Sequence, residues 1–481
     1  MALSPIEQKY YDFMDKIAIS DLRALGRKVG VAQASMQNKD EIIKKITDIY
    51  LGKVQPAPIS KRGAPTKERI IPIEYLNGLD AIRNEANRLS VGQGEFDEAY
   101  RTTGSMQDGL KTYSGILEIT PNGYGFIRTN NCQPTMNGGD VFVSAPVIYS
   151  LKLREGDLVE CTAQPQQKNN APALDSLISV NGIPRGQYES RPFFDNLTAQ
   201  YAQEKIVLSE DNDSVSLRIL DLFAPIGKGQ RALIIAPPKA GKTTLLKDIA
   251  ASIVTRHKEI KLIILLIDER PEEVTDIRMS VKGAEVVYST FDEEPEHHVR
   301  AASLTIAHAK RMAERGQDVV ILLDSLTKLT RAYNNITVSS GKTLSGGLEA
   351  SALFEPKRFF GAARNTVEAG SLTILATALV DTGSRMDDVI YEEFKGTGNA
   401  DVFLSRDLAE RRVFPAIDIR RSGTRKEELL LTKEEINAVY KLRERGFVEN
   451  SAGIIDMMKR TVNNKEFISR LPEWLKVYKN I

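Results

Sequence analysis

The sequence predicts a multidomain protein in which a small β-barrel precedes a larger α/β unit, with helical segments at both ends of the chain. Two patterns support this prediction. From Ile226 to about Leu431, apolar runs typical of strands alternate with helical segments, which indicates a mostly parallel sheet flanked by helices. From about Thr112, short strand-like segments are separated by turn residues, which indicates an antiparallel barrel.

Composition narrows the class of protein. A chain of 481 residues suggests two to four domains, and the net charge of +1 means that any nucleic-acid site must be a local patch or a channel. The only cysteines, Cys132 and Cys161, exclude a disulfide scaffold and a cysteine-rich zinc site. Because there is neither a long apolar run nor a signal pattern, we expect a cytoplasmic protein without a membrane partner.

Residues 1–52 are predicted to form a small helical module. Ser20 can cap one helix, and Asn38 with Glu41 makes a capping pair before another. The module could serve packing or assembly, or it could contact nucleic acid. Residues 53–111 begin with a Pro-rich stretch and are predicted to be a linker.

The barrel is expected over residues 112–182. Its first strands are predicted at Gly115–Thr120, Tyr124–Arg128 and Asp140–Ser144, with a turn at Pro121–Gly123. A connector, residues 183–225, should follow.

Aromatic residues of the barrel suggest a site. Strand alternation places Tyr124, Phe126 and Arg128 on one face. These aromatics could be ordinary barrel core, or they could form a stacking surface for single-stranded bases. The string Gly-Tyr-Gly-Phe-Ile-Arg, followed by Val-Phe-Val around Phe142, resembles the paired RNA-binding motifs of cold-shock OB-folds, which favours RNA.

The α/β unit, residues 226–431, should contain a parallel sheet. Its strands are predicted at Ala232–Ile235, Lys261–Ile267, Val286–Ser289, Val319–Leu323 and Ser371–Leu379. Residues 432–481 form a helical tail, which opens with a Thr432/Glu435 capping box.

The strongest motif is a phosphate-binding loop at the start of the α/β unit. The segment Ala236-Pro-Pro-Lys-Ala-Gly-Lys-Thr243 follows an apolar strand and precedes a helix, although Ala236 replaces the usual first glycine. In such a loop, backbone N–H groups hold phosphate oxygens. Lys242 would reach the β- and γ-phosphates, and Thr243 would offer its hydroxyl to Mg²⁺.

Two apolar strands end in acids near this loop. Asp268 and Glu269 close one strand, and Asp324 closes another, so all three should lie at the same sheet edge as the loop. Asp324 fits the Walker-B position that holds Mg²⁺. Glu269 could orient the attacking water, or it could be a helix cap or a salt-bridge partner.

Positive charge for the transition state could come from several arginines. Sequence alone does not choose among Arg411, Arg412, Arg420, Arg421 and Arg425. Two glycine-containing loops, Ser339–Gly347 and Asp381–Arg385, each carry one cation and could grip a phosphate backbone, or they could be ordinary surface loops.

Longer strings resemble one family. These are Leu266-Ile-Asp-Glu-Arg-Pro-Glu-Glu-Val-Thr275, Pro356-Lys-Arg-Phe-Phe-Gly-Ala-Ala-Arg-Asn365, Tyr391-Glu-Glu-Phe-Lys-Gly-Thr-Gly-Asn399, Val413-Phe-Pro-Ala-Ile-Asp418 and Arg421-Ser-Gly-Thr-Arg-Lys-Glu-Glu-Leu429. Together they resemble the Rho family of bacterial transcription termination factors, from about Gly115 to Leu430 and more loosely over the N-terminal helices.

The resemblance implies a RecA-type homohexameric ring that hydrolyses ATP with Mg²⁺. Such a ring draws single-stranded nascent RNA through its channel in the 5′→3′ direction, towards RNA polymerase and its elongation factors.

The resemblance also implies site residues. For the nucleotide these are Lys239, Ala240, Gly241, Lys242, Thr243 and Thr244 in the loop, Glu269 as catalytic glutamate, Asp324 for Mg²⁺, Phe414 on adenine, Arg425 as the finger from a neighbour, and Arg412 in the same interface. For RNA they are Tyr124, Phe126, Arg128 and Phe142 in the primary site, and Lys342, Thr382, Gly383 and Arg385 in the channel.

The chain departs from the family at three places. Lys328 replaces the usual Arg after the Walker-B strand, a basic residue is missing around Ser150, and Gln166–Pro172 replaces a segment of the primary site. The last two departures leave the preferred base open. The alternatives are an RNA-binding assembly protein with a purely structural nucleotide pocket, and a rotary or DNA-strand-exchange ATPase.

Overall fold

The computed structural model describes residues 5–29, 31, 34–50, 111–129, 139–164, 171–187, 191–338 and 343–477. The chain divides into two compact units, Met1–Gln107 and Asp108–Ile481, and each is considered by itself. Nearly all of the predicted linker, residues 53–111, lies outside the described residues. Among the residues that are described, no helix is both long and apolar enough to cross a membrane.

The first unit contains three helices, α1 (Pro5–Asp15), α2 (Ile19–Val29) and α3 (Lys39–Tyr50), with a 3₁₀ turn at Ala34–Met36. Their apolar faces meet in one core, which includes Tyr10, Met14, Leu22, Leu25, Ile42 and Ile46. The predicted Asn38/Glu41 cap is confirmed, because Asn38 Oδ1 accepts from the Glu41 N–H at 2.9 Å. The predicted cap at Ser20 is wrong: α2 begins at Ile19, and the Ala18 carbonyl accepts its first backbone bonds.

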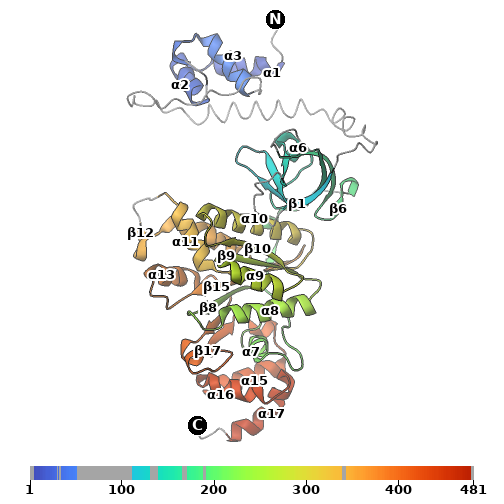
Figure 1. The fold of residues 1–481 in the computed structure, drawn as a ribbon, viewed down its shortest axis with the longest axis vertical. Helices are drawn as coiled ribbons and strands as arrows, with labels where there is room; N and C mark the ends of the chain where they lie inside the picture. Colours follow the sequence, from blue (N-terminus) through green and yellow to red (C-terminus); the bar gives the residue numbers. More distant parts are fainter. Residues whose placement is uncertain are drawn as a thin grey trace. The chain divides into compact units, whose positions relative to one another are not determined.

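The second unit begins with a barrel (Figure 1). Its strands are β1 (Lys111–Ile119), β2 (Gly125–Arg128), β3 (Val141–Val143), β4 (Leu158–Gln164) and β5 (Ala173–Val180), with β6 (Ile183–Pro184) added at the edge and the short helix α6 (Ala145–Ser150) after β3. The order β3-β2-β1-β4-β5 closes through a β3–β5 pairing. Leu117, Ile127, Val141, Val143 and Val159 fill the interior.

The α/β core is a seven-stranded sheet, ordered β10-β9-β11-β15-β8-β16-β17. Its members are β8 (Arg231–Ala236), β9 (Lys261–Glu269), β10 (Glu285–Thr290), β11 (Val319–Asp324), β15 (Leu372–Leu379), β16 (Ala400–Leu404) and β17 (Ile417–Thr424). The five predicted strands are present. Sequence analysis missed β16 and the antiparallel edge strand β17.

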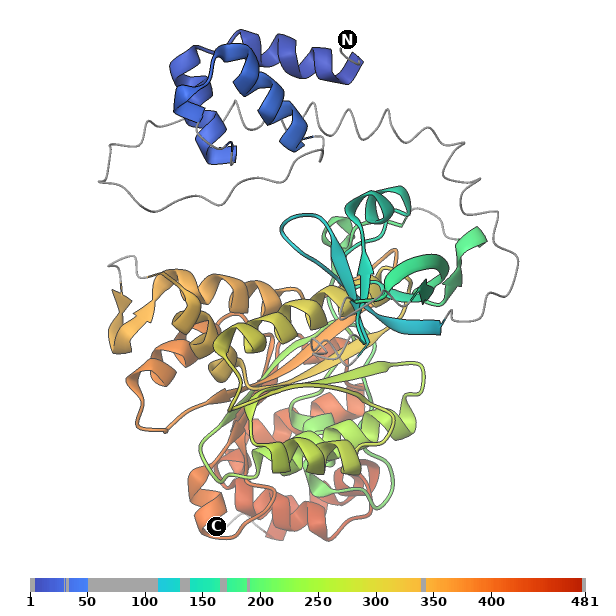
Figure 2. The ribbon, with the colours of Figure 1, turned by 45° about the horizontal axis from the view of Figure 1, so that its top comes forward.

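Helices cover both faces of this sheet (Figure 2). One layer contains α7 (Val215–Phe223), α8 (Lys242–Arg256), α9 (Pro271–Ser280) and the C-terminal helices α15 (Lys433–Glu444), α16 (Ser451–Lys459) and α17 (Asn464–Val477). The other contains α10 (Pro295–Ala313), α11 (Leu326–Ile336), α12 (Phe354–Gly361) and α13 (Arg385–Phe394). The remaining α-helix and strands of the described residues are the short helix α14 (Arg406–Glu410) and the two-residue strands β7 (Ala199–Gln200), β12 (Thr343–Leu344), β13 (Leu348–Glu349) and β14 (Asn365–Thr366).

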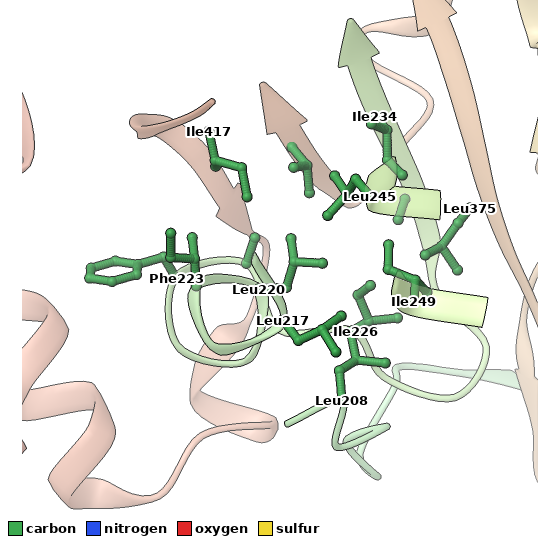
Figure 3. Packing of buried hydrophobic residues seen from close by; sticks show 14 of the residues in the cluster. Leu208, Leu217, Leu220, Phe223, Ile226, Ile234, Leu245, Ile249, Leu375 and Ile417 are labelled. Atoms are coloured by element: carbon green, nitrogen blue, oxygen red, sulfur yellow. The ribbon is translucent and has the colours of Figure 1, made fainter. Parts of the chain in front are cut away.

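Strand alternation divides the core into two apolar layers. On β8, Ile234 faces one layer, whereas Leu233 and Ile235 face the other. Figure 3 shows the first layer, in which Phe223 and Leu220 of α7 pack beside Ile417 and near Leu245 of α8. Because both faces are buried, the central strands are continuous apolar runs. The phosphate loop is thereby held between a rigid strand and a packed helix.

The C-terminal helices belong to this same core. Thr432 and Glu435 form the predicted capping box at the start of α15, and Gly446 follows the helix with φ +72°. Val439, Leu442, Met458 and Phe467 are buried against the sheet layer. The tail is therefore part of the α/β unit's packing.

Candidate functional site

The predicted phosphate loop connects β8, which ends at Ala236, to α8, which begins at Lys242. Gly241 has φ +90°, a conformation that favours glycine, and Lys239 has φ +63°. This turn brings the chain from the strand directly into the first turn of α8, where Lys242, Thr243 and Thr244 lie. Ala240, within the loop, is buried. The loop therefore presents the N-terminus of a fifteen-residue helix, where backbone N–H groups and the helix dipole favour an anion.

The acids predicted to face the loop lie beside it. Parallel β9 and β11 end at Glu269 and Asp324, at the same sheet edge as Ala236. The ammonium of Lys242 lies 2.6 Å from Asp324 Oδ1 and 3.5 Å from Glu269 Oε1. Both carboxylates are almost fully buried, with 2% and 4% of their surface exposed. The structure thus brings together the three residues whose charges phosphoryl transfer would need.

Two further residues hold these acids, and sequence analysis did not assign them this position. Lys328 on α11 donates to Glu269 Oε1 at 2.7 Å and to the Asp268 carbonyl at 2.7 Å. Thr377 on β15 donates to Asp324 Oδ1 at 2.8 Å. The available signals were a hydroxyl inside an apolar strand and a cation one helical turn beyond Asp324.

Charge and burial shift the pKa values around this cluster. Burial works against the charge of Lys242, but the carboxylates of Asp324 and Glu269 outweigh it, so its pKa is raised. Burial and the nearby charge of Glu269 raise the pKa of Glu273, in the first turn of α9. The site therefore keeps Lys242 cationic between the two carboxylates.

The residues predicted for Mg²⁺ suit a metal that arrives with a nucleotide. In the described part of the chain, no group of three or more His, Cys, Asp or Glu side chains could hold a metal ion by itself. Thr243 and Asp324 offer one hydroxyl and one buried carboxylate. Mg²⁺ is commonly bound by one or two such oxygens together with substrate phosphates and water, so this donor set fits.

A cavity of about 450 Å³ opens beside the loop. Ala240, Gly241 and Thr244 line one side, and Phe414 lines the other. Phe414 is 43% exposed, so its ring is available to a flat apolar group. The position predicted for adenine stacking is therefore adjacent to the phosphate loop.

The two predicted interface arginines lie at opposite ends of the strands of the sheet. Arg412 is exposed, has φ +58° and precedes the cavity residue Phe414 by two positions. Arg425 follows β17, and its N–H bonds to the Asn399 carbonyl at the start of β16. β16 runs parallel to β8, and β17 runs antiparallel to β16. Arg425, just after β17, therefore lies at the amino ends of the parallel strands, whereas Lys242 follows the carboxyl end of β8. The structure does not bring Arg425 to the phosphate loop of its own chain.

The two predicted channel loops meet. Gly346 packs so closely against the start of α13 that a Cβ there would lie 2.7 Å from the Met386 nitrogen. Thr382 donates to Asp387 Oδ2 at 2.6 Å, and Gly383 has φ +79°. Arg385 is the first residue of α13 and is exposed. Lys342, the cation predicted in the first loop, lies outside the described residues.

The barrel aromatics form one cluster on the outer face of the sheet. Ring centroids of Tyr124, Phe126 and Phe142 lie 5.8–5.9 Å apart in each pair. The intervening residues Ile127 and Val141 point into the barrel core and are fully buried. These three aromatics, here called the aromatic surface, are therefore not core residues.

Arg128 supports this surface. Its guanidinium carbon lies 4.8 Å from the centroid of Phe126. Its Nε donates to Glu118 at 2.6 Å and its Nη1 to Asp140 at 2.7 Å, and only 8% of the residue is exposed. The structure thus places Arg128 in ion pairs beneath the rings. Most of the Gln166–Pro172 segment lies outside the described residues.

Comparisons with known proteins match both regions. The model of the ATP synthase alpha/beta family nucleotide-binding domain matches residues 216–424, and that of the Rho termination factor RNA-binding domain matches residues 113–185. The transcription termination factor Rho of Aquifex aeolicus is 52% identical over 367 residues, which covers 74% of this chain and 84% of the relative. That of Bacillus subtilis is 52% identical over 376 residues (76% and 87%), and that of Haemophilus influenzae is 51% identical over 361 residues (73% and 86%).

Proposed function

Because the chain belongs to the transcription termination factor Rho family, we propose that it is an RNA-dependent ATPase that acts in transcription termination. In this proposal it loads on nascent single-stranded RNA, moves 5′→3′ and dissociates the RNA polymerase complex, in the cytoplasm where transcripts are made. The observation that carries the proposal is the combination, in one chain, of the Lys242–Asp324–Glu269 cluster and the aromatic surface of the barrel.

ATP cleavage is assigned to the cluster at the phosphate loop. Lys242 would bind the β- and γ-phosphates, and the loop N–H groups would hold phosphate oxygens. Glu269, fixed by Lys328, is buried at a strand end from which it can orient an attacking water. Phe414 would cover the adenine from the adjoining cavity.

Mg²⁺ would be held by the Thr243 hydroxyl and the Asp324 carboxylate. When bound, it would neutralise charge that develops on the phosphate oxygens. Asp324 is already oriented for this role, because Thr377 and Lys242 both donate to its Oδ1. Arrival of a nucleotide would draw Lys242 towards the phosphates and free that oxygen for the ion.

We propose a homohexamer with its nucleotide sites between subunits. Arg425 lies at the opposite ends of the strands from its own Lys242, so we assign its charge to the nucleotide site of a neighbouring subunit. Arg412, exposed near the cavity, is assigned to the same interface. An arginine supplied in this way typically contributes about 10³–10⁵ in rate.

RNA would contact two places. The barrel, proposed to be the domain 112–182, would stack bases on the aromatic surface. The loops around Thr382 and Arg385, which belong to the ATPase domain proposed at 226–431, would grip the backbone in a channel. The direct bond from Thr382 to Asp387, which is also bound by Arg331 of α11, gives that loop a defined conformation.

The test is the rate of ATP hydrolysis by the purified protein, alone and with a panel of single-stranded RNA homopolymers. We expect little hydrolysis without polynucleotide and strong stimulation by at least one RNA. A rate that RNA leaves unchanged would support a protein with a structural nucleotide pocket. Equal stimulation by single-stranded DNA would support a strand-exchange ATPase.

A further inference from the structure

Helix α10 (Pro295–Ala313) of the ATPase domain contacts the barrel through both side chains and backbone. In its second turn, Arg300 donates to Glu118 of β1. Further along, His308 Nδ1 lies 2.8 Å from the Gly156 carbonyl of the barrel. Gly156 has φ +86°, and a Cβ there would lie 2.3 Å from the Ala307 carbonyl carbon, so the two backbones are in direct contact. The barrel therefore cannot shift without disturbing α10.

One of these contacts leads to the aromatic surface. Glu118 Oε2 accepts from Arg300 and also, at 2.6 Å, from Nε of Arg128. Arg128 lies beneath Phe126 and is further paired with Asp140. One carboxylate oxygen thus joins an arginine of the ATPase domain to the arginine that supports the aromatic surface. Only 9% of the Arg128 side chain and 16% of the Glu118 side chain are exposed, so solvent screens this interaction weakly.

The start of α10 and the residues before it are hydrogen-bonded to the ends of β9 and β10, close to Glu269. The Glu269 carbonyl accepts from the N–H of Phe291 at 3.1 Å, four residues before α10 begins. In the second turn of the helix, His298 Nδ1 lies 2.7 Å from the Ser289 hydroxyl at the end of β10. Arg300 follows two residues later. Two hydrogen bonds therefore join the start of α10 to the ends of β9 and β10, and Arg300 lies on the same helix.

We infer that the Arg300–Glu118–Arg128 bridge couples RNA binding on the barrel to nucleotide binding in the ATPase domain. This inference rests on the proposed function. When a base stacks on Phe126, Arg128 moves or is further restrained. Its hydrogen bond to the Glu118 carboxylate then changes in strength, and the bond between that carboxylate and Arg300 changes with it. Arg300 is thus a positioning residue, which touches neither RNA nor nucleotide.

Coupling of this kind is reciprocal. If RNA on the barrel alters nucleotide affinity, nucleotide must alter the affinity of the barrel for RNA by the same factor. A purely structural bridge would hold the domains together without creating such a dependence. The dependence of RNA affinity on nucleotide is therefore the quantity that separates the two roles.

The experiment measures the dissociation constant of a fluorescent single-stranded RNA by anisotropy, with and without a non-hydrolysable ATP analogue and Mg²⁺. The RNA has about six nucleotides, within the site size of one OB-fold, and the signal that Phe126→Ala removes identifies binding at the barrel. In the wild type we expect the two dissociation constants to differ by about fivefold or more. In Arg300→Gln the ratio should fall to about one, while the affinity without nucleotide stays within about twofold of the wild type.

Two variants serve as controls. Arg300→Lys keeps a cation opposite Glu118 and should restore part of the ratio. Lys310→Gln removes a different ion pair of α10, that with Asp195 of the connector at 3.0 Å, and should behave like the wild type. Circular dichroism checks that each variant is folded.

A wild-type ratio in Arg300→Gln would overturn the inference, as would a ratio of one in the wild type. In both cases RNA-stimulated ATP hydrolysis by the same wild-type preparation would leave the proposed function standing. If that preparation shows no stimulation by RNA, the proposed function itself fails.

Discussion

The ammonium of Lys328 lies 2.7 Å from the Oε1 oxygen of Glu269, the same oxygen that Lys242 approaches at 3.5 Å. Lys328 also donates to the Asp268 carbonyl, so it fixes both the side chain and the preceding backbone of this acid. Lys328 thus provides two hydrogen bonds from one nitrogen.

Replacing Lys328 by Gln should lower the rate of RNA-stimulated ATP hydrolysis by about 10- to 100-fold, because a small misplacement of a catalytic group has an effect of this size. Lys328→Arg should retain most of the rate, since its guanidinium can reach the same acceptors. The measurement is kcat at saturating ATP and RNA. An unaltered kcat in Lys328→Gln would show that Glu269 needs no support from α11.

Lys242→Ala should abolish ATP turnover, because it removes the cation expected on the β- and γ-phosphates. The matched control is Lys247→Ala, on the same helix, whose partner is the exposed Asp276. The control should turn over ATP normally in a steady-state assay. Full activity in Lys242→Ala would refute the assignment of the phosphate site.

Phe126→Ala should weaken binding of a short single-stranded RNA to the barrel by about 5- to 150-fold, since stacking on one aromatic side chain is worth roughly 1–3 kcal/mol per base. Tyr149→Ala is the control, because Tyr149 is an exposed barrel aromatic on α6 that is not part of the aromatic surface. Affinity is measured by anisotropy over a salt series. The log–log slope should be about −0.7 for each phosphate contacted, and a flat response would exclude a site that follows the backbone.

Cys161 reports on the barrel core. It is fully buried on β4, and burial raises its thiol pKa to about 12. In a Cys132→Ser background, Cys161 should not react with a thiol reagent at neutral or mildly alkaline pH, because the thiolate is the reactive form. Reaction should become rapid in denaturant, as the pKa returns to its ordinary value. Rapid reaction without denaturant would mean that the barrel interior is open.

The parts of the fold that sequence predicted are those whose signal is local. β8, β9 and β11 are continuous apolar runs because both faces of the sheet are covered. β17 was missed because it lies at the edge of the sheet and carries Arg420, Arg421 and Ser422 in succession. Its position in the sheet depends on pairing with β16, and such pairing between strands cannot be predicted from a local sequence pattern.

The residues of the candidate site also divide into those that could be predicted from sequence and those that could not. The phosphate loop and the strand-end acids could be identified from sequence, because each follows directly from a strand and its position on the sheet. The partners of Arg128 could not, since Glu118 lies 10 residues away on β1 and Asp140 lies 12 residues away, just before β3. Likewise, Thr377 meets Asp324 only because β15 lies beside β11.

The central claim is that ATP is cleaved between neighbouring subunits, and mixing of subunits tests it most directly. Arg425→Ala subunits are mixed with wild type in increasing proportion, and RNA-stimulated ATP hydrolysis is measured for each mixture. Arg420→Ala, on β17 five residues before Arg425 and with an exposed partner in Glu449, is the matched control. Activity should fall more steeply than the fraction of wild-type subunits for Arg425→Ala and should not fall for the control. A strictly proportional loss for Arg425→Ala would contradict a site shared between subunits.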